Sequence, residues 1–209
     1  SALLAKRRDI SVLSHGENQG YGGALVSAFE YAIKNDFDVL VTIDCDGQHE
    51  PQRIPDFVEA CLQLNVDIVS GSRYLEEFAG DSSAPEQRRR VNQIITAELN
   101  ERLGLRLTDA FCGFKAYRVS QLKKLNISET GYAMPLELWV HVAHAGLQVV
   151  ERPVPRIYLD NTRSFGGELD DMSVRLDYYH LVINRALDAV DTSAGKCGVG
   201  CGGVRNKPE

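Results

Sequence analysis

The chain has 209 residues, a formal net charge of −6, 44% hydrophobic residues and 25% charged residues. These values are ordinary for a globular protein, and this length suits one domain with a sizeable core. An acidic balance without a basic field argues against a nucleic-acid binder. No apolar run approaches the roughly 20 residues of a membrane-spanning helix, and the first residues lack the apolar core of a secretion signal.

Cysteine usage indicates a reducing compartment. The five cysteines are an odd number and lack the spacing of a disulfide framework. Cys61 and Cys112 stand in apolar surroundings and are predicted to be reduced core residues. We therefore expect a cytoplasmic protein.

The first part of the chain predicts a strand, a loop, a helix and a second strand. Residues 10–13 are a short apolar run, and residues 14–23 form a polar loop rich in glycine. Apolar residues then recur at helical spacing over residues 24–33. Residues 39–43 are β-branched or aliphatic, which predicts a buried parallel strand. These elements would form a right-handed βαβ unit.

The glycine-rich loop does not fit a dinucleotide-binding fingerprint. Leu25 stands where the last glycine of that motif is required. The N-terminus of the helix behind the loop could still face a phosphate. Gly20 and Gly22 are therefore candidates for binding a phosphorylated donor.

Two carboxylates follow the strand predicted at 39–43. Asp44 and Asp46 are one residue apart, Gly47 lets the chain turn, and Pro51 suits the first turn of a helix. Open α/β sheets bind ligands at the carboxyl ends of their strands, and one or two carboxylates with substrate phosphates commonly hold Mg²⁺. Alternatively, the two aspartates only cap the strand and the next helix. The residues alone leave both interpretations open.

Cations follow the acidic pair in two places. The helix that starts at Pro51 continues to residue 64, and a strand at 66–69 leads to Arg73, which could bind an anionic substrate group or pair with the aspartates. Three arginines at 88–90 open a helix that ends at residue 103, although cations there oppose the helix dipole. This unfavourable placement points to a phosphate-binding role for one of them; alternatively, nearby acids such as Glu86 offset these charges.

The remaining pattern completes an α/β chain. We predict a segment that lines a pocket at residues 108–118 and an amphipathic helix at 136–145. Two strands follow at 147–150 and 156–159, then a last helix at 172–190 and a disordered tail at 191–209. Two polar loops, 76–85 and 160–171, are expected to flank the pocket and to be mobile.

The order of the motifs resembles family-two glycosyltransferases of the GT-A fold. The motifs are NQGYGGAL, DCDGQHEP, SGSRY, RRR, TDAFCGFKAYR, GLQVVERPV and RSFGG. The pattern is most similar to polyprenyl-phosphate glycosyltransferases, typified by dolichol-phosphate mannose synthase. The resemblance implies an α/β domain over residues 1–190, with a Rossmann-like, mostly parallel sheet flanked by helices.

The resemblance also implies roles for individual residues. Oxygen ligands of Mg²⁺ or Mn²⁺ would come from Asp44, Asp46 and Gln48. The catalytic set would include these aspartates and the arginines that meet the acceptor, which are Arg73, Arg88 and Arg163. Asn92 falls where a small polar residue joins the acceptor contact.

Two departures from the family pattern concern the substrates. The family begins with segments like VIPxYNE and DDGSTD that hold the nucleotide base and ribose, and this chain starts after them. We therefore expect that part of the donor site to be missing. The acceptor loop of the family usually reads R-x-x-G-x-S-K, but no Ser-Lys pair follows Arg163 here.

The implied reaction moves a sugar from a nucleotide diphosphate sugar to a polyprenyl phosphate or another acceptor, with inversion at the anomeric carbon. The metal would neutralise charge on the leaving diphosphate. A lipid phosphate needs no general base and implies peripheral contact with the cytoplasmic face of a membrane. A sugar hydroxyl needs a carboxylate base, for which Asp109 and Glu137 are candidates. The alternative is a non-catalytic remnant or binding subunit.

Overall fold

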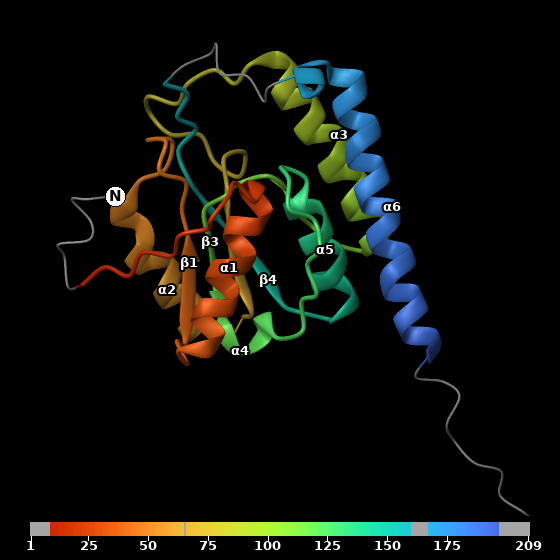
Figure 1. Ribbon diagram of the computed structural model, residues 1–209. Helices are drawn as coiled ribbons and strands as arrows, with labels where there is room; N and C mark the ends of the chain where they lie inside the picture. Colours follow the sequence, from red (N-terminus) through yellow and green to blue (C-terminus); the bar gives the residue numbers. More distant parts are fainter. Residues whose placement is uncertain (1–8, 65, 160–166, 197–209) are drawn as a thin grey trace, which may run out of the picture.

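The computed structural model describes residues 9–64, 66–159 and 167–196, and Figure 1 shows their arrangement. The strands are β1 (Val39–Thr42), β2 (Ile68–Ser72), β3 (Lys115–Arg118) and β4 (Val149–Pro153). The α-helices are α1 (Gly20–Lys34), α2 (Ile54–Gln63), α3 (Glu86–Leu103), α4 (Val119–Leu122), α5 (Met134–His144) and α6 (Met172–Lys196). Short 3-10 helices, η2 and η3, cover Pro51–Arg53 and Gly167–Asp170.

The sheet has the strand order β1-β3-β2-β4, and β3 runs against its neighbours. β1 and β2 each pair with β3 in antiparallel register, whereas β2 and β4 are parallel. The α/β class is confirmed, but the sheet is mixed, and the expected parallel pairing of β1 is wrong for the described residues. β3 enters the sheet at the edge where β1 and β2 end. One edge therefore collects the carboxyl ends of β1, β2 and β4 and the amino end of β3.

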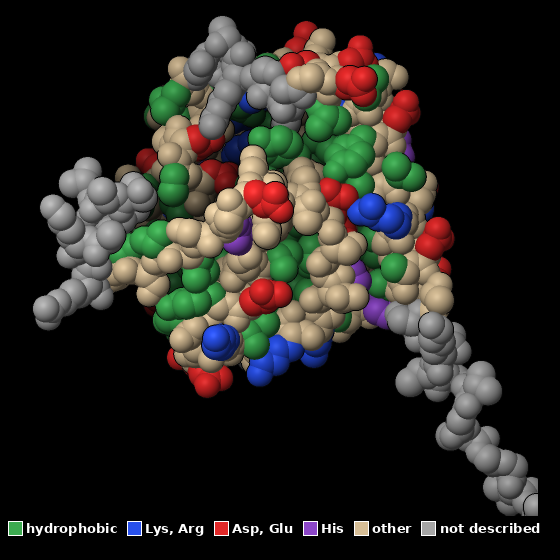
Figure 2. Space-filling model, in the orientation of Figure 1, with side chains coloured by type: hydrophobic (Ala, Val, Ile, Leu, Met, Phe, Trp, Pro, Cys, Tyr) green, Lys and Arg blue, Asp and Glu red, His purple; other side chains and the backbone are tan. Residues whose placement is uncertain are grey.

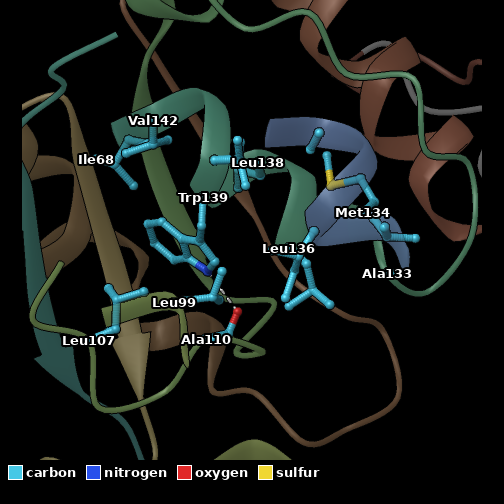
Figure 3. Close-up of a cluster of buried hydrophobic side chains, with 14 of the residues drawn as sticks. Ile68, Leu99, Leu107, Ala110, Ala133, Met134, Leu136, Leu138, Trp139 and Val142 are labelled. Carbon is cyan, nitrogen blue, oxygen red and sulfur yellow. Dashed lines mark hydrogen bonds between the residues drawn. The ribbon is translucent and has the colours of Figure 1, made fainter. Parts of the chain in front are cut away.

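Helices cover both faces of the sheet (Figure 1). On one face α2 buries Phe57 and Cys61 against β2 and β3. On the other face α1, α3, α5 and α6 form the larger core. Trp139 of α5 lies at the centre of this core, and its Nε1 donates a hydrogen bond to the carbonyl of Ala110 at 2.9 Å (Figure 3). This bond fixes the segment before β3, which forms part of the pocket floor.

Three of the elements predicted from the sequence differ in the structure. Residues 10–13 are exposed and form no strand, and the Tyr31 hydroxyl of α1 donates to Ser11 Oγ at 3.0 Å. The predicted βαβ unit is therefore absent from the described residues. Residues 156–159 are not a strand either. α6 continues to Lys196, six residues past its predicted end, and the rest of the predicted tail lies outside the described residues.

The two polar loops differ in what can be said of them. In the loop at 76–85, Asp81 accepts a hydrogen bond from the Arg156 amide at 2.9 Å, and the Ser82 amide donates to the Arg156 carbonyl at 2.7 Å. This loop is thus anchored to the segment after β4, and its mobility stays a prediction. Most of the loop at 160–171 lies outside the described residues. Within the described ranges, no helix combines the length and apolar character needed to cross a bilayer.

Candidate active site

A pocket of about 530 Å³ opens at the sheet edge where β1 and β2 end. Its lining includes Asp44, Asp46 and Gln48 of the β1–η2 turn, which we call the acidic turn (residues 44–50) and which forms the acidic side of the pocket. Arg73, Arg88 and Arg175 also line the pocket, and we call them its basic side. The lining includes aromatic rings as well, those of Tyr21, Tyr74, Phe111, Tyr132, Tyr158 and Tyr179. On the face shown in Figure 2, acidic and basic side chains are interspersed rather than segregated.

Hydrogen bonds to its own backbone hold the acidic turn. The Asp46 carboxylate accepts the Gln48 amide at 3.0 Å, and Gly47 has a φ of 80°, which favours glycine. The Asp44 carboxylate rests directly on Gly113, where a Cβ atom would overlap it. A side chain at position 113 would therefore displace the Asp44 carboxylate.

The donor atoms of the acidic turn fit a magnesium or manganese ion. Two carboxylates and an amide oxygen are hard oxygen ligands presented on one turn. Among the described residues, no three His, Cys, Asp or Glu side chains gather as a metal site. A site here would therefore complete its coordination with oxygens of a substrate, as magnesium sites commonly do.

Arg73 is held by a buried carboxylate. Its Nε and Nη2 donate to the two oxygens of Asp109 at 2.7 Å and 2.9 Å, and its amide donates to the same carboxylate at 3.2 Å. Asp109 is fully buried. Burial alone would raise the pKa of Asp109, but Arg73 and a hydrogen bond from Asn92 outweigh burial and lower that pKa to about 2. The pair remains ionised, and the guanidinium has a fixed orientation.

Asn92 supports this pair. Its Nδ2 donates to Asp109 at 2.7 Å, and its Oδ1 accepts the Thr96 hydroxyl at 2.9 Å. Although Asn92 borders the pocket, both polar groups of its side chain are used inside the protein. Asn92 therefore supports Arg73 through Asp109, and its contact with an acceptor stays a prediction.

Neither carboxylate considered as a general base is suited to that role. Asp109 has a pKa of about 2 and is paired with Arg73. Glu137 is 4% exposed, and it accepts the Ser128 amide at 2.9 Å, the Ser128 hydroxyl at 2.7 Å and the Glu129 amide at 2.6 Å. Both groups are committed to structure.

Arg88 differs from Arg89 and Arg90 in its exposure, and a further arginine, Arg175, lines the pocket. Arg88 is half-buried and lines the pocket, whereas Arg89 and Arg90 are exposed. Arg175, near the start of α6, is 3% exposed, lines the same pocket and donates to the Leu169 carbonyl at 3.1 Å. Sequence reasoning missed Arg175. The signal that singled out Arg88, a cation at the start of a helix, was present there too.

Gly20 and Gly22 serve the packing of α1. The amides of Gly22 and Gly23 donate to the Thr130 carbonyl at 2.8 Å and 3.3 Å. Side-chain atoms at Gly20 or Gly22 would collide with the backbone of residues 129–130. A protein carbonyl thus occupies the helix N-terminus that was expected to face a phosphate, and neither glycine lines the pocket. Donor binding by these glycines stays a prediction.

Tyr21, between these glycines, is the residue of α1 that faces the pocket. Its ring stacks on that of Tyr132 with centroids 5.9 Å apart. Burial, followed by the charge of Asp44, raises the pKa of Tyr21. The phenol therefore stays protonated beside the acidic turn.

The structure brings together most of the predicted site. Asp44, Asp46, Gln48, Arg73 and Arg88 line one pocket, as expected. Arg163 lies outside the described residues. Lys115 was not predicted: it is 2% exposed, and its ammonium contacts the Cys112 carbonyl beneath the pocket. Burial lowers the pKa of Lys115.

Solved structures with the same architecture define the class of the fold. Glucosyl-3-phosphoglycerate synthase from Mycobacterium tuberculosis, in complex with phosphoglyceric acid, superimposes with a TM-score of 0.59 at 17% identity, covering 83% of this chain and 57% of that one. Mannosyl-3-phosphoglycerate synthase from Rubrobacter xylanophilus gives 0.55 at 16% identity, covering 91% and 57%. At such identities the likeness shows the fold alone. The fold is that of a GT-A glycosyltransferase.

The family is then established from the sequence. The profile of glycosyl transferase family 2 matches residues 1–125, and the chain belongs to that family of transferase enzymes. Undecaprenyl-phosphate mannosyltransferase from Micrococcus luteus is 28% identical over 184 residues, which are 85% of this chain and 74% of the relative. Polyprenol monophosphomannose synthase from Mycolicibacterium smegmatis is 29% identical over 72% of this chain and 57% of its own length. The predicted family resemblance is confirmed.

Proposed function

We propose that this chain is a catalytic region that transfers a sugar from a nucleotide diphosphate sugar to a polyprenyl phosphate, with inversion and with Mg²⁺ or Mn²⁺. The observation that carries the proposal is the set of charged groups that line one pocket. The two carboxylates of the acidic turn and the guanidinium groups of Arg73, Arg88 and Arg175 all line it. Such a pocket suits two phosphorylated substrates, one bound through a metal and one bound through cations.

The donor side is assigned to the acidic turn. Asp44, Asp46 and Gln48 would hold the metal, which, when bound, supplies positive charge that stabilises the leaving diphosphate. A related fold, glucosyl-3-phosphoglycerate synthase, was crystallised with Mn²⁺, UDP and glucosyl-3-phosphoglycerate. Its TM-score to this chain is 0.52. This supports a divalent metal on the donor side.

The acceptor side is assigned to the arginines. A phosphate monoester is anionic at neutral pH, so it can attack without a general base. This agrees with the full hydrogen bonding of Asp109 and Glu137. Arg73 and Arg88 would orient the phosphate and reduce its repulsion from the donor. The names of two relatives, an undecaprenyl-phosphate mannosyltransferase and a polyprenol monophosphomannose synthase, point to the same acceptor class.

A lipid-linked acceptor would also bring the pocket to a membrane surface, on the cytoplasmic face. Leu159 is 69% exposed, and its Cδ1 lies close to Gly47 of the acidic turn. We expect this side chain to contact lipid. Replacing Leu159 with Ser should reduce co-sedimentation with vesicles, and unchanged co-sedimentation would contradict this contact.

A transfer assay tests the proposal. Radiolabelled UDP-sugars and GDP-sugars are offered with undecaprenyl phosphate, and undecaprenol without the phosphate is the matched control. The expected result is a labelled lipid from the phosphorylated acceptor only, formed with Mn²⁺ and abolished by a chelator. Equal transfer to undecaprenol, or transfer that survives chelation, would contradict the proposal.

The alternative is a non-catalytic remnant or binding subunit. β1 lies at the edge of the described sheet, and Phe37 just before it is 52% exposed. Such an edge can pair with further polypeptide. A folded chain that transfers no sugar under any of these conditions would favour this alternative.

A further inference from the structure

His49 is the sixth residue of the acidic turn. Its side chain is 6% exposed and does not line the pocket. Its ring packs against that of Phe114, with centroids 5.6 Å apart. The Asp44 amide donates a hydrogen bond to His49 Nδ1 at 3.2 Å, which joins the first residue of the turn to the sixth. The imidazole therefore closes the turn without lining the pocket.

This hydrogen bond defines the state of the ring. A nitrogen that accepts an N–H group has a free lone pair, so the proton of a neutral imidazole must be on Nε2. Nε2 lies 3.9 Å from Cys112 Sγ inside the protein. Both ring nitrogens are thus engaged away from the pocket.

Two other contacts act on the same turn. The Asp44 carboxylate rests on Gly113, and the Asp46 carboxylate accepts the Gln48 amide at 3.0 Å. These contacts position the carboxylates, but neither fixes the main chain where β1 ends. The Asp44 amide needs an acceptor at that point, and His49 Nδ1 is the one it has. Loss of the acceptor would free the Asp44 backbone to rotate.

We propose that His49 is a positioning residue of the donor site, which fixes the Asp44 main chain so that the carboxylates of the acidic turn face the pocket. The proposal rests on the proposed function in one respect, which is that the acidic turn binds a metal. His49 itself would contact neither metal nor substrate. Residues that orient metal ligands typically change metal affinity by about 10-fold to 100-fold when replaced.

Two variants with matched loss of the ring test the proposal. In His49→Asn, the side-chain oxygen falls near the position of Nδ1 and can accept the Asp44 amide. In His49→Gln, the carboxamide extends to the position of Nε2 and leaves Nδ1 without a substitute. Circular dichroism and thermal unfolding check that both variants fold. Any defect shared by the two reports packing against Phe114, and the difference between them reports the hydrogen bond.

Two readouts are measured on each variant. Hydrogen exchange of the Asp44 amide, followed by NMR without ligands, reports the hydrogen bond itself. Titration of Mn²⁺ in the presence of UDP, followed by electron paramagnetic resonance, reports the metal site. We expect His49→Asn to resemble the wild type in both. In His49→Gln we expect faster exchange at Asp44 and Mn²⁺ binding weakened by about 10-fold or more.

The outcomes separate this inference from the proposed function. Unchanged exchange and unchanged Mn²⁺ affinity in His49→Gln would overturn the inference. Equal defects in the Asn and Gln variants would also overturn it, because the ring would then act by packing alone. If the wild type binds no Mn²⁺ with UDP, the proposed metal site fails, and exchange at Asp44 still decides whether His49 holds the turn.

Discussion

The two sides of the pocket are built in different ways. On the basic side, Arg73 is held by a buried carboxylate through two side-chain hydrogen bonds of 2.7 Å and 2.9 Å, and Asn92 supports that carboxylate. On the acidic side, the turn from Asp44 is held by the Gln48 amide, by Gly113 and by the ring of His49. A salt bridge fixes Arg73 on the basic side, whereas hydrogen bonds of backbone amides and packing hold the acidic side.

This difference indicates how each side meets its ligand. The charge of Arg73 is matched within the protein, so Arg73 should contribute direction and hydrogen bonds more than net charge. Asp44 and Asp46 carry two negative charges on one short turn, and both line the pocket, which suits the binding of a divalent cation. We therefore expect the basic side to be preorganised and the acidic side to complete its structure when a metal and a diphosphate bind.

The largest effect should come from breaking the acidic side. Replacing Asp46 with Asn removes one charged ligand of the proposed metal and should lower transfer by about a thousandfold, or about 4 kcal/mol. The melting temperature should change little because Asp46 is on a surface turn. Asp38→Asn, the same charge change at the other end of β1, is the control and should keep full activity. Equal activity in both variants would remove Asp46 from the mechanism.

Breaking the salt bridge of the basic side should instead lower the stability of the fold. Asp109→Asn leaves Arg73 with an uncompensated buried charge and should destabilise the fold by about 3–5 kcal/mol. Urea unfolding measures this loss. The double variant Asp109→Asn with Arg73→Gln should recover part of the stability, because the unpaired charge is then gone. A double variant as unstable as the sum of the two single variants would show that the pair is not coupled.

The same pair predicts a pH dependence with a defined sign. The pKa of Asp109 is about 2 in the folded protein against an ordinary value of 3.8, so the folded state binds this proton less tightly than the unfolded state. The stability contributed by Asp109 is therefore complete above about pH 5 and is lost as the pH falls from about 4 to about 2. Urea midpoints of the wild type should fall more steeply over this range than those of Asp109→Asn. Parallel curves would contradict the assignment.

Arg88 sharpens the comparison with a smaller and selective effect. Arg88→Ala should raise the KM for polyprenyl phosphate by about 10-fold, since charge-assisted hydrogen bonds contribute about 1.5–3 kcal/mol. Binding of the nucleotide diphosphate should stay the same because its charge is met by the metal. Arg89→Ala, one residue away and exposed, is the matched control. Equal losses for donor and acceptor would return Arg88 to a general electrostatic role.

The smallest effect concerns the hydrogen bonds that join α6 to the segment that carries Tyr132. The Glu129 carboxylate accepts the Tyr178 hydroxyl at 2.6 Å, the Gly131 amide at 2.7 Å and Arg185 at 2.8 Å. Glu129→Gln keeps the shape but removes the charge, and it should cost about 1 kcal/mol, or a few degrees in melting temperature. Amide exchange in residues 128–132 should rise. Unchanged exchange would show that other contacts hold this segment.

The part of the site that could be predicted from the sequence consists of residues with local sequence signals. The strand end at Asp44, the Arg73 motif and the misplaced cation at Arg88 are local signals, and the structure places all three in one pocket. The partner of Arg73 lies 36 residues away at Asp109, and nothing local indicates that pairing. Asp109 was consequently taken as a candidate base, although it is the counter-ion of Arg73.

Other parts of the site depend on contacts that are distant in the sequence. Glycines at positions 20 and 22 indicate that something approaches closely, but the sequence does not show that the Thr130 carbonyl does so. The direction of β3 depends on where the preceding segment enters the sheet, which apolar periodicity does not record. Arg175 was missed for a different reason, since its signal at a helix start was present and was applied only to Arg88.

Calorimetric titration of the wild-type chain with UDP or GDP, with and without Mn²⁺, tests the central claim most directly. The claim is that the acidic turn binds a diphosphate through a metal. We expect binding that requires Mn²⁺ and disappears in Asp46→Asn. Binding that is equal without the metal, or that survives in Asp46→Asn, would contradict it, as would silence of the wild type at about millimolar ligand, which corresponds to a binding free energy of only about 4 kcal/mol.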